Sequence, residues 1–301
     1  MFQRAYDMQS CLILLLALLA NQLVNEKAGN TDDTNDDALR ATVAASAKDF
    51  AARCEFIAEG TGKAKLVLHP EPILRWSNPT VGKVFGEVFV WTDNGRPAAI
   101  GSWYRWFSPD WGRTFEVCSL AGGRVTGRIN EIVFWNTAKS GLTLKPLAEA
   151  DAPAKTPATR LAQMRRLAGD FAAHLADTRG NDAGVKRQLR LLPQPVFRYL
   201  APKAGSTYLD GALFAFVEGT DPEVFLVLEA TDEVTWEYGL VRMNSDALRI
   251  TFREKDVWTV SKIENPLNLL KEPYALITSE EVLREPVSID KKSPPATKAK
   301  P

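Results

Sequence analysis

The sequence predicts an α+β fold with an internal duplication, in which each unit is one N-terminal helix followed by a 5-6-stranded antiparallel sheet. Two stretches 123 positions apart, LVLHPEPILRWSNP (66–79) and LRLLPQPVFRYLAP (189–202), share six identical residues. Each stretch follows a segment whose apolar residues recur at three- and four-residue steps. Each also precedes segments in which apolar residues alternate. That change of period is typical of a helix followed by strands.

The similarity continues on both sides of the two stretches. Upstream, residues 49–52 (DFAA) return as 170–173, and downstream, residues 86–91 (GEVFVW) correspond to 211–216 (GALFAF). A unit of about 120 residues is much longer than the roughly 20 to 50 residues of a solenoid repeat. Each copy could hold its own core, or the two could share one core as a pseudo-dimer.

Composition divides the chain into six parts. They are a signal peptide (1–28), an acidic disordered leader (29–37), a first α+β repeat unit (38–144), a linker rich in proline and alanine (145–157), a second repeat unit (158–270) and a partly disordered C-terminal tail (271–301).

The N-terminus predicts export. The apolar run CLILLLALLA (11–20) follows Arg4 and is too short to cross a bilayer as a helix, which takes roughly 20 residues. It fits the apolar region of a secretory signal peptide. An uncleaved signal anchor and initiation at Met8 are the alternatives. We expect the protein in the periplasm, in the cell envelope or secreted, with no membrane insertion after signal removal.

Each unit is expected to begin with an amphipathic helix. Apolar residues at helical spacing support this in both copies: Leu39, Val43, Ala47, Phe50 and Cys54 in the first, and Leu161, Met164, Leu167, Phe171 and Leu175 in the second.

Strands are expected to follow each helix. Leu66 and Leu68 open a strand that Pro70 ends, since proline cannot donate to a sheet ladder. Asn94-Gly95 between two apolar runs predicts a tight hairpin. Further strands are expected at 73–76, 87–92, 98–106, 113–120 and 130–135, and in the second copy at 211–216, 234–242 and 248–260.

The charge balance limits the partners. Lysine plus arginine and aspartate plus glutamate both number 37, so the formal net charge is zero. A nucleic-acid-binding protein normally carries a basic excess, which neutralises phosphates. We therefore expect no nucleic acid as a partner. Cys54 and Cys118 are either a disulfide or two small buried apolar residues.

The sequence predicts no catalytic, cofactor-binding or metal-binding residue. It contains no phosphate-binding glycine loop, no G-x-S-x-G, no C-x-x-C and no H-E-x-x-H. The two histidines, His69 and His174, are not matched by histidine in the other copy.

Two charged residues are the same in both copies. Arg75 corresponds to Arg198, and Glu116 to Glu237. We predict a structural Arg–Glu ion pair inside each sheet, because each charge would offset the desolvation of the other. The alternative is a duplicated arginine site for anions or carboxylates.

An aromatic cluster, SWYRWFSPDW (102–111), has no counterpart in the second copy. Alternate residues of a strand face opposite ways, so part of this run is expected in the core. The remainder, Tyr104, Trp106 and Trp111, is a candidate binding patch, with a protein or a glycan as the partner.

The sequence also resembles a family of uncharacterised exported, signal-peptide-bearing proteins of planctomycete bacteria. The resemblance rests on RLAQMRRLAGDFAAHL, LRLLPQPVFRY, DGALFAFVEGTDPEVFLVLEA and WEYGLVRM in the second copy, and on NPTVGKVFGEVFVWTDNGRPAAIGSWYR in the first. It implies an envelope or secreted location and no particular activity.

The leading functional hypothesis is a non-catalytic exported protein, a tandem module for binding or scaffolding in the cell envelope. The alternative is an enzyme that acts on a small molecule or polysaccharide in a cleft between the two units. A closed apolar interface between the units favours the first. A cleft that holds carboxylates with perturbed pKa values favours the second.

Overall fold

The predicted fold, a duplicated α+β module with one helix and one 5-6-stranded sheet per unit, is wrong, because the chain is mainly antiparallel β-sheet. A computed structural model describes residues 35–59, 63–109, 111–176, 186–203, 206–267 and 269–283. Of these residues, 51% are in strands, including a curled half-barrel sheet, and 16% are in three helices. The predicted signal peptide lies outside the described residues. None of the described helices is both long and apolar enough to span a bilayer.

The helices are shorter than the sequence predicts. The first covers 35–53, α2 covers Pro157–Gly169 and α3 covers Glu280–Leu283. Cys54 begins strand β1, whereas Phe171 and Leu175 lie in strand β11 and point into the core with Ala173. A spacing of four residues fits both a helix and every second residue of a strand, so the pattern did not show where the helix ends.

Nineteen strands are assigned among the described residues. Those of the first half are β1 (Cys54–Glu59), β2 (Lys63–Lys65), β3 (Val67–Leu68), β4 (Leu74–Ser77), β5 (Lys83–Asp93), β6 (Arg96–Ser108), β7 (Gly112–Ser119), β8 (Arg124–Ile129) and β9 (Ile132–Thr137). Those after it are β10 (Lys145–Pro146), β11 (Phe171–Ala176), β12 (Lys186–Leu191), β13 (Phe197–Leu200), β14 (Asp210–Glu218), β15 (Asp221–Ala230), β16 (Trp236–Arg242), β17 (Ala247–Phe252), β18 (Lys255–Val260) and β19 (Tyr274–Ile277).

These strands form three sheets. The orders are β2-β1-β8-β9, β19-β7-β6-β5-β3 with β4 also on β5, and β10-β16-β15-β14-β12-β11-β17-β18 with β13 also on β14. The predicted Asn94-Gly95 hairpin is confirmed: β5 pairs with β6, and both turn residues have positive φ, 48° and 86°.

Two short strands outside the predicted repeat units extend the sheets. β10 lies within the segment predicted as a linker and pairs with β16 of the second half. β19 lies within the segment predicted as a tail and pairs with β7 of the first half. β19 therefore crosses from the end of the second half to a sheet of the first, so the first half does not form this sheet alone.

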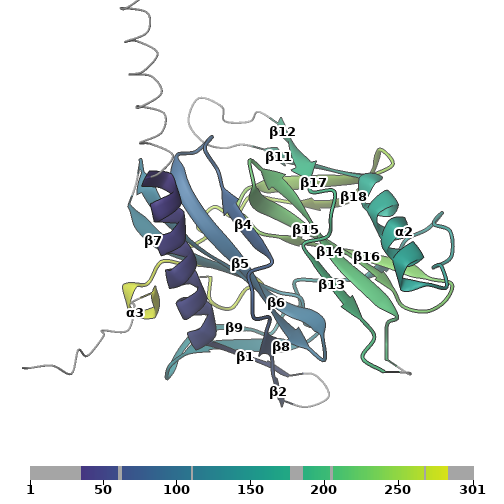
Figure 1. Ribbon diagram of the computed structural model, residues 1–301, viewed down its shortest axis with the longest axis horizontal. Helices are drawn as coiled ribbons and strands as arrows, with labels where there is room; N and C mark the ends of the chain where they lie inside the picture. The colour runs from purple at the N-terminus through teal and green to yellow at the C-terminus, as the bar shows by residue number, and fades with distance from the viewer. Residues whose placement is uncertain are drawn as a thin grey trace, which may run out of the picture.

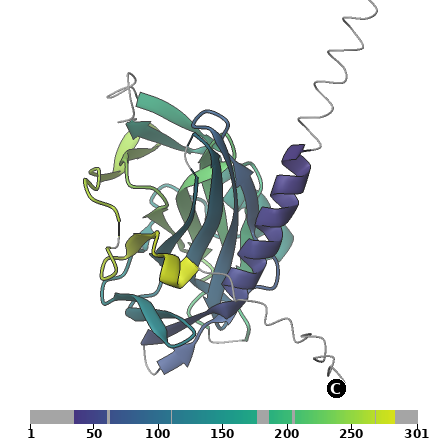
Figure 2. The ribbon, with the colours of Figure 1, turned by 90° about the vertical axis from the view of Figure 1, so that its left-hand side faces the viewer.

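Three apolar clusters fill the structure. One lies between the first helix and the strands of the first half, and a second lies under α2. The third joins the outer face of β4–β7 to that of β14–β16. Figure 1 shows the first helix, in purple, and α2 at opposite ends of the molecule with the strands between them. Figure 2 shows the first helix along one flank of these strands.

A buried ion triad attaches α2 to its sheet. Asp210 is fully buried at the start of β14 and accepts a hydrogen bond from Nε of Arg160 at 2.9 Å. Arg198 of β13 reaches both oxygens of the same carboxylate, at 3.1 and 2.8 Å. One carboxylate thus joins a helix and two strands.

We expect Asp210→Ala to lower the free energy of unfolding by about 3–5 kcal/mol, because it leaves two arginines without their shared carboxylate in a buried site. Urea denaturation measures this. The control is Asp151→Ala, which removes the partner of Arg166, an ion pair whose carboxylate side chain is 80% exposed and worth at most about 1 kcal/mol. Equal losses in the two variants would contradict a structural role for the triad.

Candidate functional site

A small cleft lies beside the cluster that the two halves share. Its volume is about 200 Å³, and strands from both halves line it. Its chemically distinctive side chains are Trp76, Tyr104, Trp106, Glu116, Asp221 and Glu223. We name it the acid–aromatic cleft.

The aromatic wall comes from strand alternation in β6. Tyr104 and Trp106 are two positions apart, so they lie on the same face, and both line the cleft. Trp103 and Phe107 point the other way and pack in the cluster under the first helix. Part of the aromatic run is therefore core, as the sequence predicts, and two members of the predicted patch meet at one cavity.

Trp76 completes this wall from β4. Its ring lies so close to Gly86 that a Cβ added there would come within 2.4 Å of it. Its Nε1 donates to Oγ of Ser102 at 2.9 Å, and its ring lies 5.1 Å from that of Tyr104. The indole is thus fixed in place by a glycine, a hydrogen bond and a ring contact.

Trp111, the third predicted patch residue, is not part of this cleft. It follows β6 in the turn before β7, is 73% exposed and contacts the edge of Phe107 with ring centroids 6.0 Å apart. Tyr104, by contrast, is only 7% exposed. The three aromatic residues therefore do not form one surface.

Four acidic residues line the cleft with this aromatic wall: Glu116, Asp221, Glu223 and Asp246. Glu116 of β7 accepts a hydrogen bond from the hydroxyl of Tyr274 at 2.9 Å. Asp221, the first residue of β15, accepts from Nδ2 of Asn78 at 3.5 Å. Glu223, two positions along β15, accepts from Nδ2 of Asn244. These hydrogen bonds come from neutral donors.

Burial favours the protonated form of Glu116, and burial together with repulsion between acids favours that of Asp221. Burial raises the pKa of Glu116 to about 7, against the hydrogen bonds from Tyr274 and Tyr104. Burial, followed by the charges of Glu223 and Glu116, raises the pKa of Asp221 well above its usual range. The cleft therefore holds carboxyl groups that can donate as well as accept hydrogen bonds near neutral pH.

The four residues predicted to form ion pairs lie apart. Arg75 binds Glu87 across β4 and β5, with Nε 2.8 Å from Oε1, and Arg198 belongs to the Asp210 triad. Register explains this placement. Arg75, Glu87, Trp103 and Phe115 face one another in one row, so Glu116 points to the opposite side of the sheet.

The second half has the same arrangement. Arg198 shares a row with Ala212, Leu228 and Tyr238, so Glu237 also points to the opposite side of its sheet. Arg75, Glu116 and Arg198 each form side-chain hydrogen bonds, but the sequence analysis paired them wrongly.

Asp221 and Glu223 were missed by the sequence analysis, although a signal was present. The hairpin sequence DNGRP of the first half corresponds to EGTDP in the second, so Asp221 stands where the first half has Arg96. Arg96 binds both oxygens of the buried Glu229 at 2.9 Å, and the Tyr199 hydroxyl donates to that carboxylate at 2.8 Å. The first hairpin thus places the cation Arg96 beside a buried acid. The second hairpin places another acid, Asp221, at the corresponding position.

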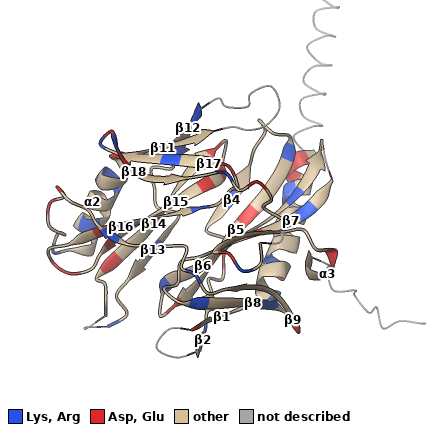
Figure 3. Cartoon of the chain, turned by 180° about the vertical axis from the view of Figure 1, so that it is seen from behind, with Lys and Arg blue, Asp and Glu red and all other residues tan. Residues whose placement is uncertain are grey.

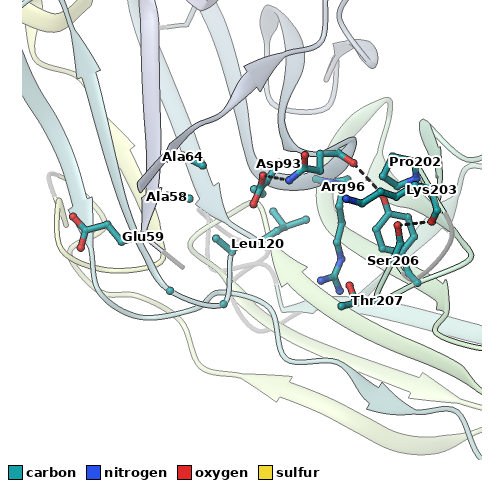
Figure 4. A pocket seen from close by; sticks show the side chains of 17 residues that line it. Ala58, Glu59, Ala64, Asp93, Arg96, Leu120, Pro202, Lys203, Ser206 and Thr207 are labelled. Atoms are coloured by element: carbon teal, nitrogen blue, oxygen red, sulfur yellow. Dashed lines mark hydrogen bonds between the residues drawn. The ribbon is translucent and has the colours of Figure 1, made fainter. Parts of the chain in front are cut away.

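The hairpin tip of the first half borders a larger groove of about 800 Å³ (Figure 4). Figure 4 shows Ala58, Glu59 and Ala64 on one side and Arg96, Lys203 and Ser206 on the other. The hydroxyl of Tyr208 donates to the carbonyl of Asn94 at 3.2 Å. Since Arg96 is already neutralised by Glu229, this broad groove offers less specific chemistry than the acid–aromatic cleft.

The described part of the chain contains no group of three or more His, Cys, Asp or Glu side chains placed to hold a metal ion. Cys54 and Cys118 are separate buried thiols, and burial raises the pKa of both. Figure 3 shows lysine and arginine interspersed with acidic residues over both halves.

No protein-family model, no curated protein and no solved structure matches this chain. Its site is therefore interpreted from its own geometry and chemistry.

We expect Glu116→Gln to make stability less dependent on pH. The folded-state pKa of about 7 lies above the ordinary value of 4.5, so stability is complete below pH 4.5 and declines as the pH rises to 7. The slope due to this group is at most about 1.4 kcal/mol per pH unit. Urea denaturation from pH 4 to 8 should show a shallower decline in the variant.

The control for this experiment is Glu55→Gln. A hydrogen bond and the charge of Lys65 hold the pKa of Glu55 below its usual range, so this change should leave the decline between pH 4.5 and 7 in place. An unchanged decline in Glu116→Gln would contradict the assignment.

Proposed function

We propose that this chain is an exported, non-catalytic binding protein that holds one sugar residue of a glycan in the acid–aromatic cleft. The observation that carries the proposal is the meeting of Tyr104 and Trp106 with Glu116 and Asp221 in one small cavity. Aromatic faces pack against the C–H faces of sugar rings, and carboxyl and amide groups bind their hydroxyls.

The size and charge of the cleft support a small hydroxylated ligand. Its volume of about 200 Å³ is below the roughly 300–1,000 Å³ of pockets that enclose drug-sized molecules. In their ionised form its acids would repel a phosphate or a nucleic-acid backbone. A neutral sugar instead can donate to ionised carboxylates and accept from protonated ones, together with Asn244 and Ser245 on the rim.

The apolar contact between the halves favours a binding protein with a fixed cavity over a protein whose halves move apart to open a cleft. The cleft lies beside a closed cluster that includes Val88, Ile100, Leu213 and Phe225, all buried. A rigid cavity of this kind loses little conformational entropy when a ligand enters.

An enzyme that acts on a sugar is the second candidate, and the pKa of Glu116 favours it. A general acid works best with a pKa near the operating pH, and many glycosidases use two carboxyl groups. Glu116, at about 7, and Asp221 could have these roles. Turnover of the bound glycan, lost in Glu116→Gln while binding persists, would replace the binding proposal with this one.

We expect Trp106→Ala to weaken sugar binding about tenfold or more, because it removes the half-buried aromatic face of the cleft. A screen of mono- and oligosaccharides by ligand-observed NMR, followed by calorimetry, measures this. Trp111→Ala is the matched control, since it removes the same side chain outside the cleft. If Trp111→Ala weakens binding and Trp106→Ala does not, the cleft is not the site.

A further inference from the structure

A second cavity, separate from the acid–aromatic cleft, lies against the ends of β16 and β18. Its volume is about 580 Å³. Ile263, Leu269 and residues 272–274 close one side of it, and backbone hydrogen bonds hold the two ends of this side. Ser119 N–H donates to the Pro273 carbonyl at 2.9 Å, and Ile263 N–H to the Ser245 carbonyl at 2.7 Å. The cavity is therefore formed before any ligand arrives. We name it the arginine cavity.

The walls of the arginine cavity are mostly apolar. They include Val241, Trp258, Val260, Ile263 and Leu269. The closing segment also carries two exposed leucines, Leu267 at 55% and Leu270 at 37%. Apolar side chains thus continue from the cavity wall to the neighbouring surface, as a ligand with a long apolar part requires.

Arg242 places a positive charge in this apolar wall. Its guanidinium donates to three backbone carbonyls, those of Asn244 at 2.8 Å, Asp246 at 2.6 Å and Ser261 at 3.1 Å. These carbonyls fix its orientation but carry no net charge. Three hydrogen bonds also leave two of its five N–H groups for another acceptor.

Two acids lie near Arg242: Asp246, whose backbone carbonyl accepts from it, and Glu272 of the cavity wall. Glu272 is bound by Lys139 through both oxygens at 2.8 Å. Burial lowers the pKa of Arg242, with Tyr274 and Asp246 acting in the opposite direction. Lys262, which also lines the cavity, forms only a surface pair with Glu264 at 3.5 Å.

We propose that the arginine cavity binds an aliphatic carboxylate, with its head group on Arg242 and its chain along Trp258, Val260 and Leu269. A planar carboxylate accepts two parallel hydrogen bonds from a guanidinium, which gives the head group a defined position. The volume is within the range of cavities that enclose small-molecule ligands.

Calorimetry with dodecanoate, below its micelle concentration, tests the proposal. Dodecyltrimethylammonium has the same chain with the opposite charge, and acetate has the same head group without the chain. We expect dodecanoate to bind at least tenfold more tightly than either. Equal binding of dodecanoate and the ammonium compound would overturn the role of Arg242, and equal binding of acetate would overturn the role of the apolar wall.

Two variants locate the site. Arg242→Gln and Trp258→Ala should each weaken dodecanoate binding about tenfold or more, whereas Arg249→Gln, which removes an arginine paired with Asp256 on β17 and β18, should not. Thermal unfolding confirms that each variant is folded. If Arg242→Gln does not fold, the head-group comparison on the unaltered protein together with Trp258→Ala decides. Dodecanoate binding that survives Trp258→Ala at full strength would overturn the proposal.

Discussion

The apolar contact between the outer faces of β4–β7 and β14–β16 is the constraint on which the rest of the structure depends. The opposite faces of the same strands pack under the first helix and under α2, so the central strands are covered on both sides. Nine consecutive residues of β5 and eight of β14 are buried for this reason. Neither half can leave this contact without exposing a full face of Val, Leu, Ile and Phe side chains to water.

Backbone pairing adds a second connection between the halves, through β19. β19 continues the β5–β6–β7 sheet, and β10 continues the β14–β15–β16 sheet, each after the chain has passed through the other half. Unfolding the second half would therefore release β19 from the sheet of the first half, and unfolding either half would remove half of the shared cluster. We expect the two halves to unfold in one cooperative step, because no large part of the interface can be lost separately.

Local features of this fold could be predicted from the sequence, whereas long-range ones could not. Asn94-Gly95 defines its hairpin because the two residues themselves tolerate positive φ. The end of the first helix was misplaced, since Phe50 and Cys54 are spaced four apart and fit a helix or a strand equally well. The predicted Arg–Glu pairs are wrong for a different reason. Strand order and register decide which side chains face one another, and the spacing of residues along the sequence does not determine either.

The candidate site shows the same division. The sequence predicts that Tyr104 and Trp106 lie on one face of a strand, because this alternation depends on β6 alone. That Asp221 of the second half completes their cleft depends on how the two halves pack. Its partner position in the first half, Arg96, neutralises a buried acid, whereas Asp221 adds to two others. An acid at this position lowers stability, because it must be buried beside two other acids. Acids whose pKa values are shifted by burial in a cavity are more common at functional sites than elsewhere.

Tyr274 connects the crossing strand with both cavities. It is the first residue of β19, its hydroxyl donates to Glu116 in the acid–aromatic cleft, and its side chain lines the arginine cavity. With β19 in place on β7, Tyr274 completes the wall of the arginine cavity and supplies the hydrogen bond that Glu116 of the cleft accepts. The strand that stabilises the contact between the halves is also the one that completes the sites beside it, so the placement of binding chemistry at this junction follows from the way the two halves are joined.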